Sequence, residues 1–404
     1  MTRPLNAAMI EGLFDIASRA PSAHNTQPWL PRLVDISEEG ARIRVRTDAE
    51  RTLPVTDPHG ADLGLSLGCW VETCAIAAAA EGLQLRELRI TGERQDVTIE
   101  FVLAPKSAAG AGSGADPSDG TVSAQFSVAE VLARQVDRGR LRRDTAAVEA
   151  AVAEYRQLRP YAIYDRTVQG KTHSLAAVVQ PAGDEQPAAD AQPAGQESPV
   201  PGIAIAQVPE AVWVKAARYA QSAPFEPREA FDETLRWLRL DDRDPRYQED
   251  GLTAATLRLP KAAARLAARL LGGDEAPDAA RDRLRDMLVT AGAWSTMLPT
   301  FIAGKAPDRL ALAIEARHPS AVSAQQWVLL GRELMRLWLI FARHGLRVAV
   351  ESQLKDVQLP AAMLADVLRR TAPPRHGDKP VYQPFAAFSV GHSTGPVPRS
   401  PRLR

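Results

Sequence analysis

The stretch from Ala20 to Trp29 (APSAHNTQPW) carries the side chains best suited to chemistry in this sequence. Pro21 and Pro28 bracket two hydroxyls, an imidazole and two carboxamides, and each proline fixes the chain and removes a backbone donor. A stiff loop with outward amides and polar side chains can bind the polar edge of a flat ring. The alternative is structural: a helix ends here and a strand begins, with Trp29 packed in the core.

His24 titrates near neutral pH, so it is a candidate catalytic residue that would deliver a proton to a bound substrate. The competing interpretation is a loop histidine that hydrogen-bonds to the backbone, which is the commoner role.

Basic residues gather at two other places. Five arginines lie between positions 134 and 143, and Arg399 and Arg402 lie near the end of the chain. A charge cluster is usually a solvated face, and chain ends are commonly loose. On their own, these arginines therefore define no site.

Composition excludes several classes of function. The 404 residues include 49 Lys+Arg and 49 Asp+Glu, so there is no global basic footprint for nucleic acid. The two cysteines, Cys69 and Cys74, allow neither a disulfide framework nor a multi-cysteine zinc site, and we interpret both as small core residues. No signal-peptide pattern is present, and the most apolar run, 337–342, is far shorter than the ~20 residues of a spanning helix. We expect a cytoplasmic protein with no metal site and no nucleic-acid or membrane partner.

Two low-complexity stretches divide the chain. Residues 106–121 predict a flexible linker and residues 183–201 a disordered loop, because neither contains enough large apolar side chains to offset its ordering entropy. They separate an N-terminal part, 1–105, from a C-terminal part, 122–404.

Hydrophobic periodicity predicts helices and antiparallel strands in both parts, which indicates the α+β class. In the N-terminal part we expect the order α-loop-β-β-α-β-β, with helices at 9–17 and 61–83, one strand before the turn at 38–40, and further strands at 41–45, 85–90 and 97–103. In the C-terminal part we expect helices at 128–136, 145–158, 210–221, 227–238, 261–271 and 321–344. The strands expected there are 161–164, 174–179, 202–206, 297–303, 310–316, 346–350 and 385–390.

The stretch 20–29 resembles the APS-x-x-N-x-Q-P-W signature of the nitroreductase superfamily of FMN-dependent flavoproteins, in particular its single-chain Acg-like branch. Further stretches resemble motifs of that branch in the same order: 51–60, 66–68, 134–138, 236–237, 250–251, 331, 344–346 and 398–402. Residues 134–138 depart from the family in their middle, which reads Gln-Val-Asp where relatives often show Arg-Thr-Asn, so that Asp137 stands in place of Asn. A carboxylate beside a phosphate would be repulsive unless it faces away or pairs with an arginine.

The resemblance implies a nitroreductase-like fold in which one chain imitates the family's homodimer, as a pseudo-dimer of two related halves with a helical lid at 227–271. The chain would then be a monomer, or at most a weak homodimer, with FMN at the seam. The N-terminal half would contribute the flavin-contacting loop, and the C-terminal half would contribute the arginines that neutralise the phosphate. The implied cofactor-binding residues are Pro21, Ser22, Ala23, His24, Asn25, Arg134, Arg138, Arg399 and Arg402.

The function implied is an FMN oxidoreductase that passes hydride or electrons to a small organic acceptor such as a nitroaromatic or a quinone. No Gly-rich dinucleotide fingerprint is present, so NAD(P)H would act only as a transient donor stacked on the flavin. One alternative is a flavin-sequestering or storage protein, in which the lid covers the FMN and prevents turnover. Another is a flavin-free structural partner.

Overall fold

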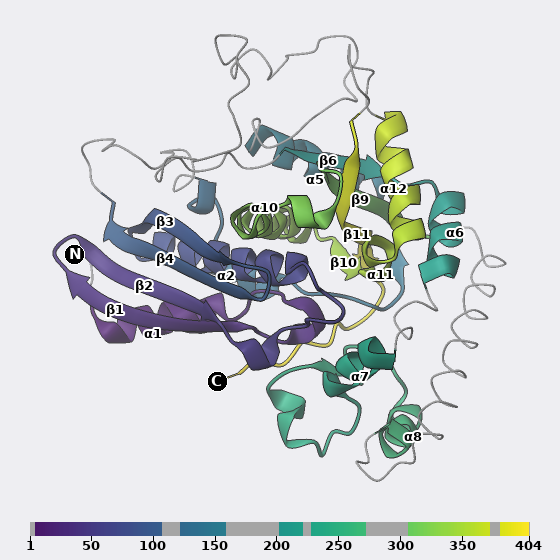
Figure 1. Cartoon of the computed structure of the whole chain (residues 1–404), viewed down its shortest axis with the longest axis horizontal. Helices are drawn as coiled ribbons and strands as arrows, with labels where there is room; N and C mark the ends of the chain where they lie inside the picture. Colours follow the sequence, from purple (N-terminus) through teal and green to yellow (C-terminus); the bar gives the residue numbers. More distant parts are fainter. Residues whose placement is uncertain are drawn as a thin grey trace.

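The computed structural model describes residues 5–106, 122–158, 202–220, 228–271, 306–371 and 380–403. Outside these residues lie the linker from residue 107 on, the loop at 183–201 and the strands expected at 161–164, 174–179 and 297–303. The described part mixes helices with two main antiparallel sheets, one on each side of a central helix pair (Figure 1). This confirms the α+β class.

The N-terminal part of the chain forms a four-stranded antiparallel sheet in the order β1-β2-β4-β3, packed against two helices. Its elements are α1 (Ala7–Ala17), β1 (Trp29–Ser37), β2 (Gly40–Thr47), α2 (Ala61–Ala80), β3 (Leu83–Glu93) and β4 (Asp96–Pro105). The predicted alternation in β2 is confirmed: Ile43 and Val45 are buried, whereas Arg42 and Arg44 face solvent. Helix α1 ends at Ala17, before Pro21, as expected.

The C-terminal part of the chain forms a second sheet in the order β10-β11-β9-β6, with β5 paired to β11. Its strands are β5 (Leu141–Arg142), β6 (Ile203–Gln207), β9 (Asp308–Glu315), β10 (Arg347–Val350) and β11 (Tyr382–Ser393). Its helices are α4 (Val128–Ala133), α5 (Thr145–Leu158), α6 (Glu210–Ala220), α10 (Ala324–Arg343), α11 (Gln353–Asp356) and α12 (Gln358–Thr371). Helix α4 ends three residues before the predicted boundary at 136, and α12 was not predicted.

The segment expected to be a lid contains α7 (Arg228–Arg236) and α8 (Lys261–Leu271). Between them, β7 (Leu238–Arg239) and β8 (Leu252–Thr253) form a short parallel pair on either side of the 3-10 helix η5 (Pro245–Gln248).

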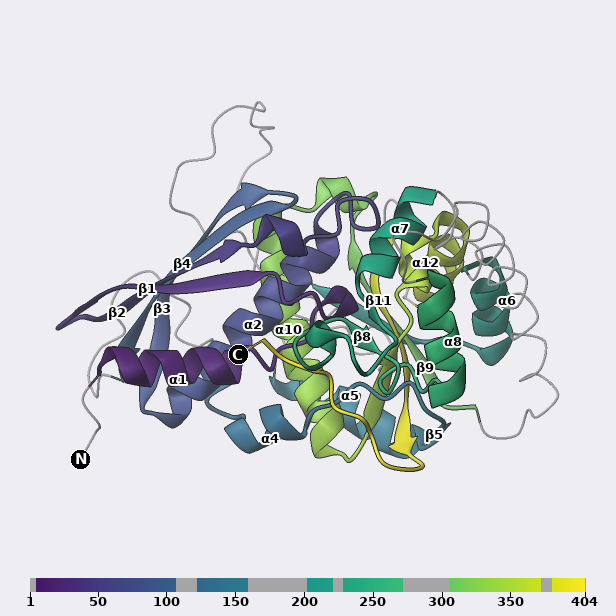
Figure 2. The same ribbon diagram turned by 90° about the horizontal axis from the view of Figure 1, so that it is seen from below.

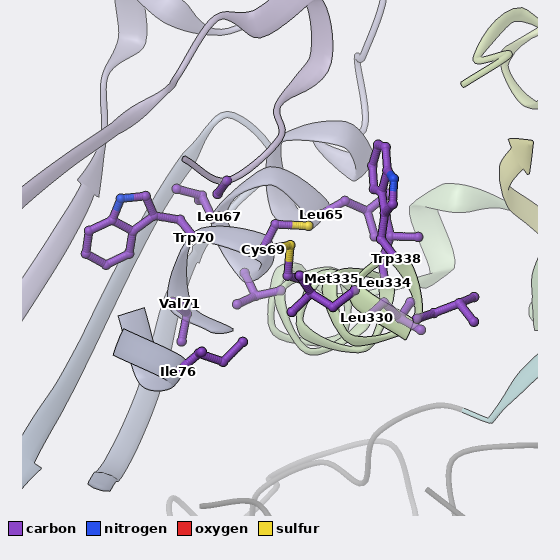
Figure 3. Packing of buried hydrophobic residues seen from close by; sticks show 14 of the residues in the cluster. Leu65, Leu67, Cys69, Trp70, Val71, Ile76, Leu330, Leu334, Met335 and Trp338 are labelled. Carbon is purple, nitrogen blue, oxygen red and sulfur yellow. The ribbon is translucent and has the colours of Figure 1, made fainter. Parts of the chain in front are cut away.

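Helices α2 and α10 pack against each other between the two sheets (Figure 1), and buried apolar side chains of both helices lie at their contact (Figure 3). Small residues let their backbones approach closely. A Cβ atom on Gly68 would lie 2.0 Å from the carbonyl oxygen of Val328, and a Cβ on Gly331 would lie 2.2 Å from the carbonyl oxygen of Leu65. No larger residue fits at either glycine without moving a backbone, which is the small-residue contact that close helix pairs use.

A buried network of charges ties the same two helices together. Arg336 of α10 donates Nε and Nη2 to the two carboxylate oxygens of Glu72 of α2, at 2.7 and 2.8 Å. Arg332 also donates to Glu72 at 2.9 Å, and Arg336 reaches Glu333 at 2.5 Å. Tyr155 of α5 donates to the second oxygen of Glu333. Because these groups are buried, each depends on its partners to offset the loss of water.

Helix α2 is long and apolar enough to cross a membrane by length and composition, but 89% of that window is buried inside the protein. Its apolarity is therefore explained by its place in the core. Cys69 and Cys74 lie in this helix as buried free thiols, as predicted, and burial raises the pKa of each to about 12.

Candidate arginine-lined functional site

A surface hollow lies between the loop at 20–28, the segment 134–138 and the residues that follow β11. We call those residues, 394–403, the C-terminal strap; they run back beneath the central helices to end near the loop (Figure 2). The hollow is lined by Arg19, Pro21, Ser22, Asn25, Val131, Arg134, Gln135, Val136, Arg138, Leu252, Pro398, Arg399, Ser400 and Arg402. Seven of the nine residues proposed to bind the cofactor therefore lie around one space. Ala23 and His24 do not line it.

The loop is held in an unusual backbone conformation. His24, Asn25 and Gln27 all have positive φ angles, of 47°, 56° and 54°. Non-glycine residues rarely adopt this region, and three in one short loop need surroundings that hold them there. Such strain concentrates at functional sites, so the loop is a candidate binding element on backbone geometry as well as on sequence.

Side chains of the loop bond to backbone groups of segments that lie far along the chain. Gln27 is fully buried; its Nε2 donates to the carbonyl oxygen of Glu249 at 2.8 Å, and its Oε1 accepts from the backbone N–H of Leu403 at 3.0 Å. Asn25 donates to the carbonyl oxygen of Pro401 at 3.1 Å. The strap, expected to be loose at its end, is therefore bonded to the loop.

A second brace is centred on the buried carboxylate of Asp250. It accepts hydrogen bonds from Arg51, Arg239 and Arg246, and Arg51 also donates to the carbonyl oxygen of Thr26 at 2.9 Å. The motifs at 51–60 and 250–251 thus meet directly beneath the loop, although they lie about two hundred residues apart in the sequence.

The electrostatics of the hollow favour an anion. Its lining includes five arginines and no aspartate or glutamate within the described ranges of the chain. Burial lowers the pKa of Arg134 to about 10, and burial together with the charges of Arg134 and Arg19 lowers the pKa of Arg402 well below its usual value. Burial and the charge of Arg399 also lower the pKa of Arg19. Guanidinium groups that are this close and this poorly solvated are stabilised by a negative charge among them.

Some guanidinium nitrogens in the hollow have no partner. Arg134 donates Nη2 to the carbonyl oxygen of Arg19 at 3.0 Å and lies over the ring of Trp338, 4.8 Å from its centroid. Arg402 donates Nη1 to Asn25 at 2.8 Å. Among the residues that the structure describes, Nε and Nη1 of Arg134 and Nε of Arg402 are buried without an acceptor. Buried donors of this kind are rare and need an explanation, which a bound anion would supply.

Asp137 does not oppose an anion here. It is buried outside the lining of the hollow and accepts hydrogen bonds from Arg258 at 2.5 Å and from Ser393 at 2.6 Å. Although burial raises the pKa of Asp137, the bonds from Ser393 and Arg258 outweigh burial and hold it below its usual value. The departure from the family pattern is therefore balanced by an arginine, as the sequence required.

His24 lies outside the lining of the hollow. Its Nδ1 is buried without a partner among the described residues. Burial lowers its pKa, with opposing influences from Asp62 and Glu233, which raise it, and from Arg138 and Lys355, which lower it. The imidazole is therefore neutral at pH 7, which suits a hydrogen-bonding role better than proton donation.

Arg19 was missed by the sequence analysis. It immediately precedes the APS motif, and that position beside a predicted binding loop was the signal that could have identified it.

Comparison with curated proteins finds related sequences over a short stretch. The chain is 38% identical over 81 residues to "Putative NAD(P)H nitroreductase Rv3131" of Mycobacterium tuberculosis, which is 20% of this chain and 22% of the relative. It is 30% identical over 96 residues to "Uncharacterized protein Rv3127" of the same species, covering 28% of that protein. The chain thus matches about a quarter of the length of these relatives. No family model matches. The resemblance to the nitroreductase superfamily, predicted from the motifs, is confirmed by the first of these relatives.

Two solved structures are similar at a low level. The FMN and NADPH-dependent nitroreductase NfnB from sphigopyxis sp. strain HMH is 16% identical, with a TM-score of 0.27 over 67% of this chain and 93% of the enzyme. A variant of that enzyme is 18% identical with a TM-score of 0.26, over 67% of this chain and 92% of the variant. TM-scores of 0.27 and 0.26 do not establish that this chain has the fold of that enzyme.

Proposed function

We propose that this chain is an FMN-dependent oxidoreductase of the nitroreductase type, in which the arginine-lined hollow holds the FMN phosphate. The observation that carries the proposal is the convergence of five arginines from three separate segments on a space with no acidic lining residue in the described part of the chain. A phosphate monoester carries close to two negative charges and three acceptor oxygens, which matches the unpartnered guanidinium donors.

The size of the hollow fits a phosphate. Its volume is about 50 Å³. His24 lies next to Asn25 in the loop, and Asn25 lines the hollow. A ligand anchored by its phosphate could extend from the arginines towards His24 and Ala23, which do not line the hollow.

We further propose that the two halves imitate a dimer. Helices α2 and α10 correspond at a constant offset of 263 residues, since Gly68 matches Gly331 and the helix-ending Gly82 matches Gly345. Under this correspondence Leu65 matches Val328, so the Gly68–Val328 approach and the Gly331–Leu65 approach are one contact made twice. Reciprocal contacts of this kind are the mark of a two-fold interface. One chain would then contain the whole seam and work as a monomer in the cytoplasm.

Bound FMN would supply hydride or electron transfer to a small acceptor such as a nitroaromatic or a quinone, with NAD(P)H as the transient donor. Arg134 and Arg402 would hold the phosphate, and the strained loop would orient the ring. The neutral imidazole of His24 would place a hydrogen-bonding nitrogen beside the bound groups.

Flavin storage is the second candidate, because the segment expected to be a lid is bonded to the N-terminal part of the chain. After α7, the carbonyl oxygen of Glu249 accepts a hydrogen bond from Gln27 of the loop. Glu233 of α7 accepts hydrogen bonds from the backbone N–H groups of Val55 and Thr56 at 3.0 and 2.8 Å. A cover fixed beside the loop would keep a nicotinamide away from a flavin, so flavin could bind without turning over.

A visible spectrum of the purified protein, recorded before and after anaerobic addition of NADPH, tests both candidates. The proposal predicts a flavin band that bleaches with NADPH. A band that persists would favour storage. Protein that neither carries a flavin band nor acquires one on addition of FMN would refute both.

A further inference from the structure

Asp137 joins three segments that meet at the hollow. Its backbone N–H donates to the carbonyl oxygen of Val348 of β10 at 3.0 Å, which fixes the segment 134–138 beside the C-terminal sheet. Its carboxylate accepts from Arg258, from Ser393 and from the backbone N–H of Gly139 at 2.8 Å. We call Asp137, Gly139, Arg258 and Ser393 the Asp137 junction.

The junction is tightly packed. A Cβ atom on Gly139 would lie 2.9 Å from Oδ1 of Asp137 and 3.1 Å from both Nε and Nη2 of Arg258. Gly139 therefore leaves just enough room for the ion pair, and a side chain at this position would press on both partners.

The residues of the junction are connected, through the chain or through a hydrogen bond, to segments that carry arginines of the hollow. Ser393 is the last residue of β11, and the strap that follows it carries Arg399 and Arg402. Arg258 also donates Nη1 to the carbonyl oxygen of Pro396 in the strap at 2.7 Å. On the other side, Asp137 lies next to Arg138 in the sequence. The junction thus sets where two groups of arginines stand relative to one another.

We propose that Asp137 is a positioning residue for the arginines that bind the phosphate. Its ion pair with Arg258 and its hydrogen bond from Ser393 hold the arginines of the strap close to those of the segment 134–138. This inference rests on the proposed function, since it assumes that the hollow binds the phosphate of FMN. Asp137 acts through Arg138, Arg399 and Arg402 and does not touch the ligand.

Positioning and charge predict opposite effects of an Asp137 substitution on FMN affinity. Removing a negative charge near an anion site should strengthen anion binding if charge alone mattered. If positioning dominates, Asp137→Asn weakens FMN binding although it makes the site more positive. We expect a rise of about tenfold in Kd, as for loss of one charge-assisted bond in a network.

Fluorescence titration of flavin-free protein with FMN and with riboflavin, which lacks the phosphate, measures this effect. Asp137→Asn and Gly139→Ala should each weaken FMN binding and leave riboflavin binding unchanged. Asp35→Asn removes the same charge from the exposed outer sheet and should change neither. Arg258→Gln, at a side chain that is 31% exposed, should mimic Asp137→Asn, and combining the two should add little.

FMN binding that is equal or tighter in Asp137→Asn than in the wild type overturns the inference. Equal losses for FMN and riboflavin in Asp137→Asn and Arg258→Gln also overturn it, because they would show general destabilisation. If the wild type itself binds both flavins equally, the proposed function fails and this inference falls with it. That failure is seen without any variant, so the two failures are distinguishable.

Discussion

Replacing Arg134 with methionine should raise the stability of the ligand-free protein and weaken its binding of FMN. The buried guanidinium has a pKa lowered to about 10, and at about 1.4 kcal/mol per pH unit its charged form costs the ligand-free fold about 3 kcal/mol. The replacement also removes the hydrogen bond to the carbonyl oxygen of Arg19 and the contact with Trp338, together worth about 2 kcal/mol. Without ligand, Arg134→Met should therefore be more stable than the wild type by about 1 kcal/mol.

With saturating FMN, the wild type should become more stable than Arg134→Met. A ligand at a hundred times its Kd stabilises the folded state by about 2.7 kcal/mol, and the variant should lose most of that gain because it lacks a central phosphate donor. Urea unfolding of flavin-free protein, with and without FMN in phosphate-free buffer, measures both effects. Arg32→Met, at an exposed position on β1, serves as the control and should change neither value by more than about 0.5 kcal/mol. A variant that is destabilised without FMN and still stabilised fully by it would refute the reasoning.

Three further predictions concern the framework. Arg336→Met should lower the free energy of unfolding by about 3–5 kcal/mol, because it leaves Glu72 buried with a broken ion pair; an unchanged urea midpoint would contradict this. Gly68→Ala should cost about 1–3 kcal/mol or more by thermal unfolding, because its Cβ would meet the backbone oxygen of Val328, whereas wild-type stability would show that the helices are not in contact. The folded pKa of His24 lies below its unfolded value of 6.5, so the stability it contributes is present above pH 6.5 and lost as the pH falls below it. Between pH 7.5 and 5.5 the wild type should lose up to about 1.4 kcal/mol more than His24→Gln, and parallel pH profiles would contradict this.

Periodic features of the sequence predicted the framework well. The alternation of Ile43 and Val45 with arginines fixed the strand, and the three- and four-residue spacing from Val328 to Phe341 fixed α10. Helix α12 was not predicted from the sequence, because Pro360 interrupts its apolar pattern. Proline is tolerated in the first turn of a helix, where it lies here.

The site was only partly predictable. The motifs identified seven residues that meet at the hollow, but not the positive φ angles of the loop, which depend on bonds to Glu249 and Leu403 far along the chain. The partner of Asp137 could not be read from the sequence either, because Arg258 lies about 120 residues away and only the folded chain brings them together. Local patterns predict elements, whereas long-range pairs of charges require the tertiary structure.

Discrimination between FMN and riboflavin by the wild-type protein tests the central claim most directly. Two charge-assisted contacts to the phosphate, from Arg134 and Arg402, should together contribute about 3 kcal/mol, which is about a hundredfold in Kd. Fluorescence titration of flavin-free protein should therefore show FMN binding about a hundred times more tightly than riboflavin. Equal affinity for the two flavins, or no binding of either, would contradict the account.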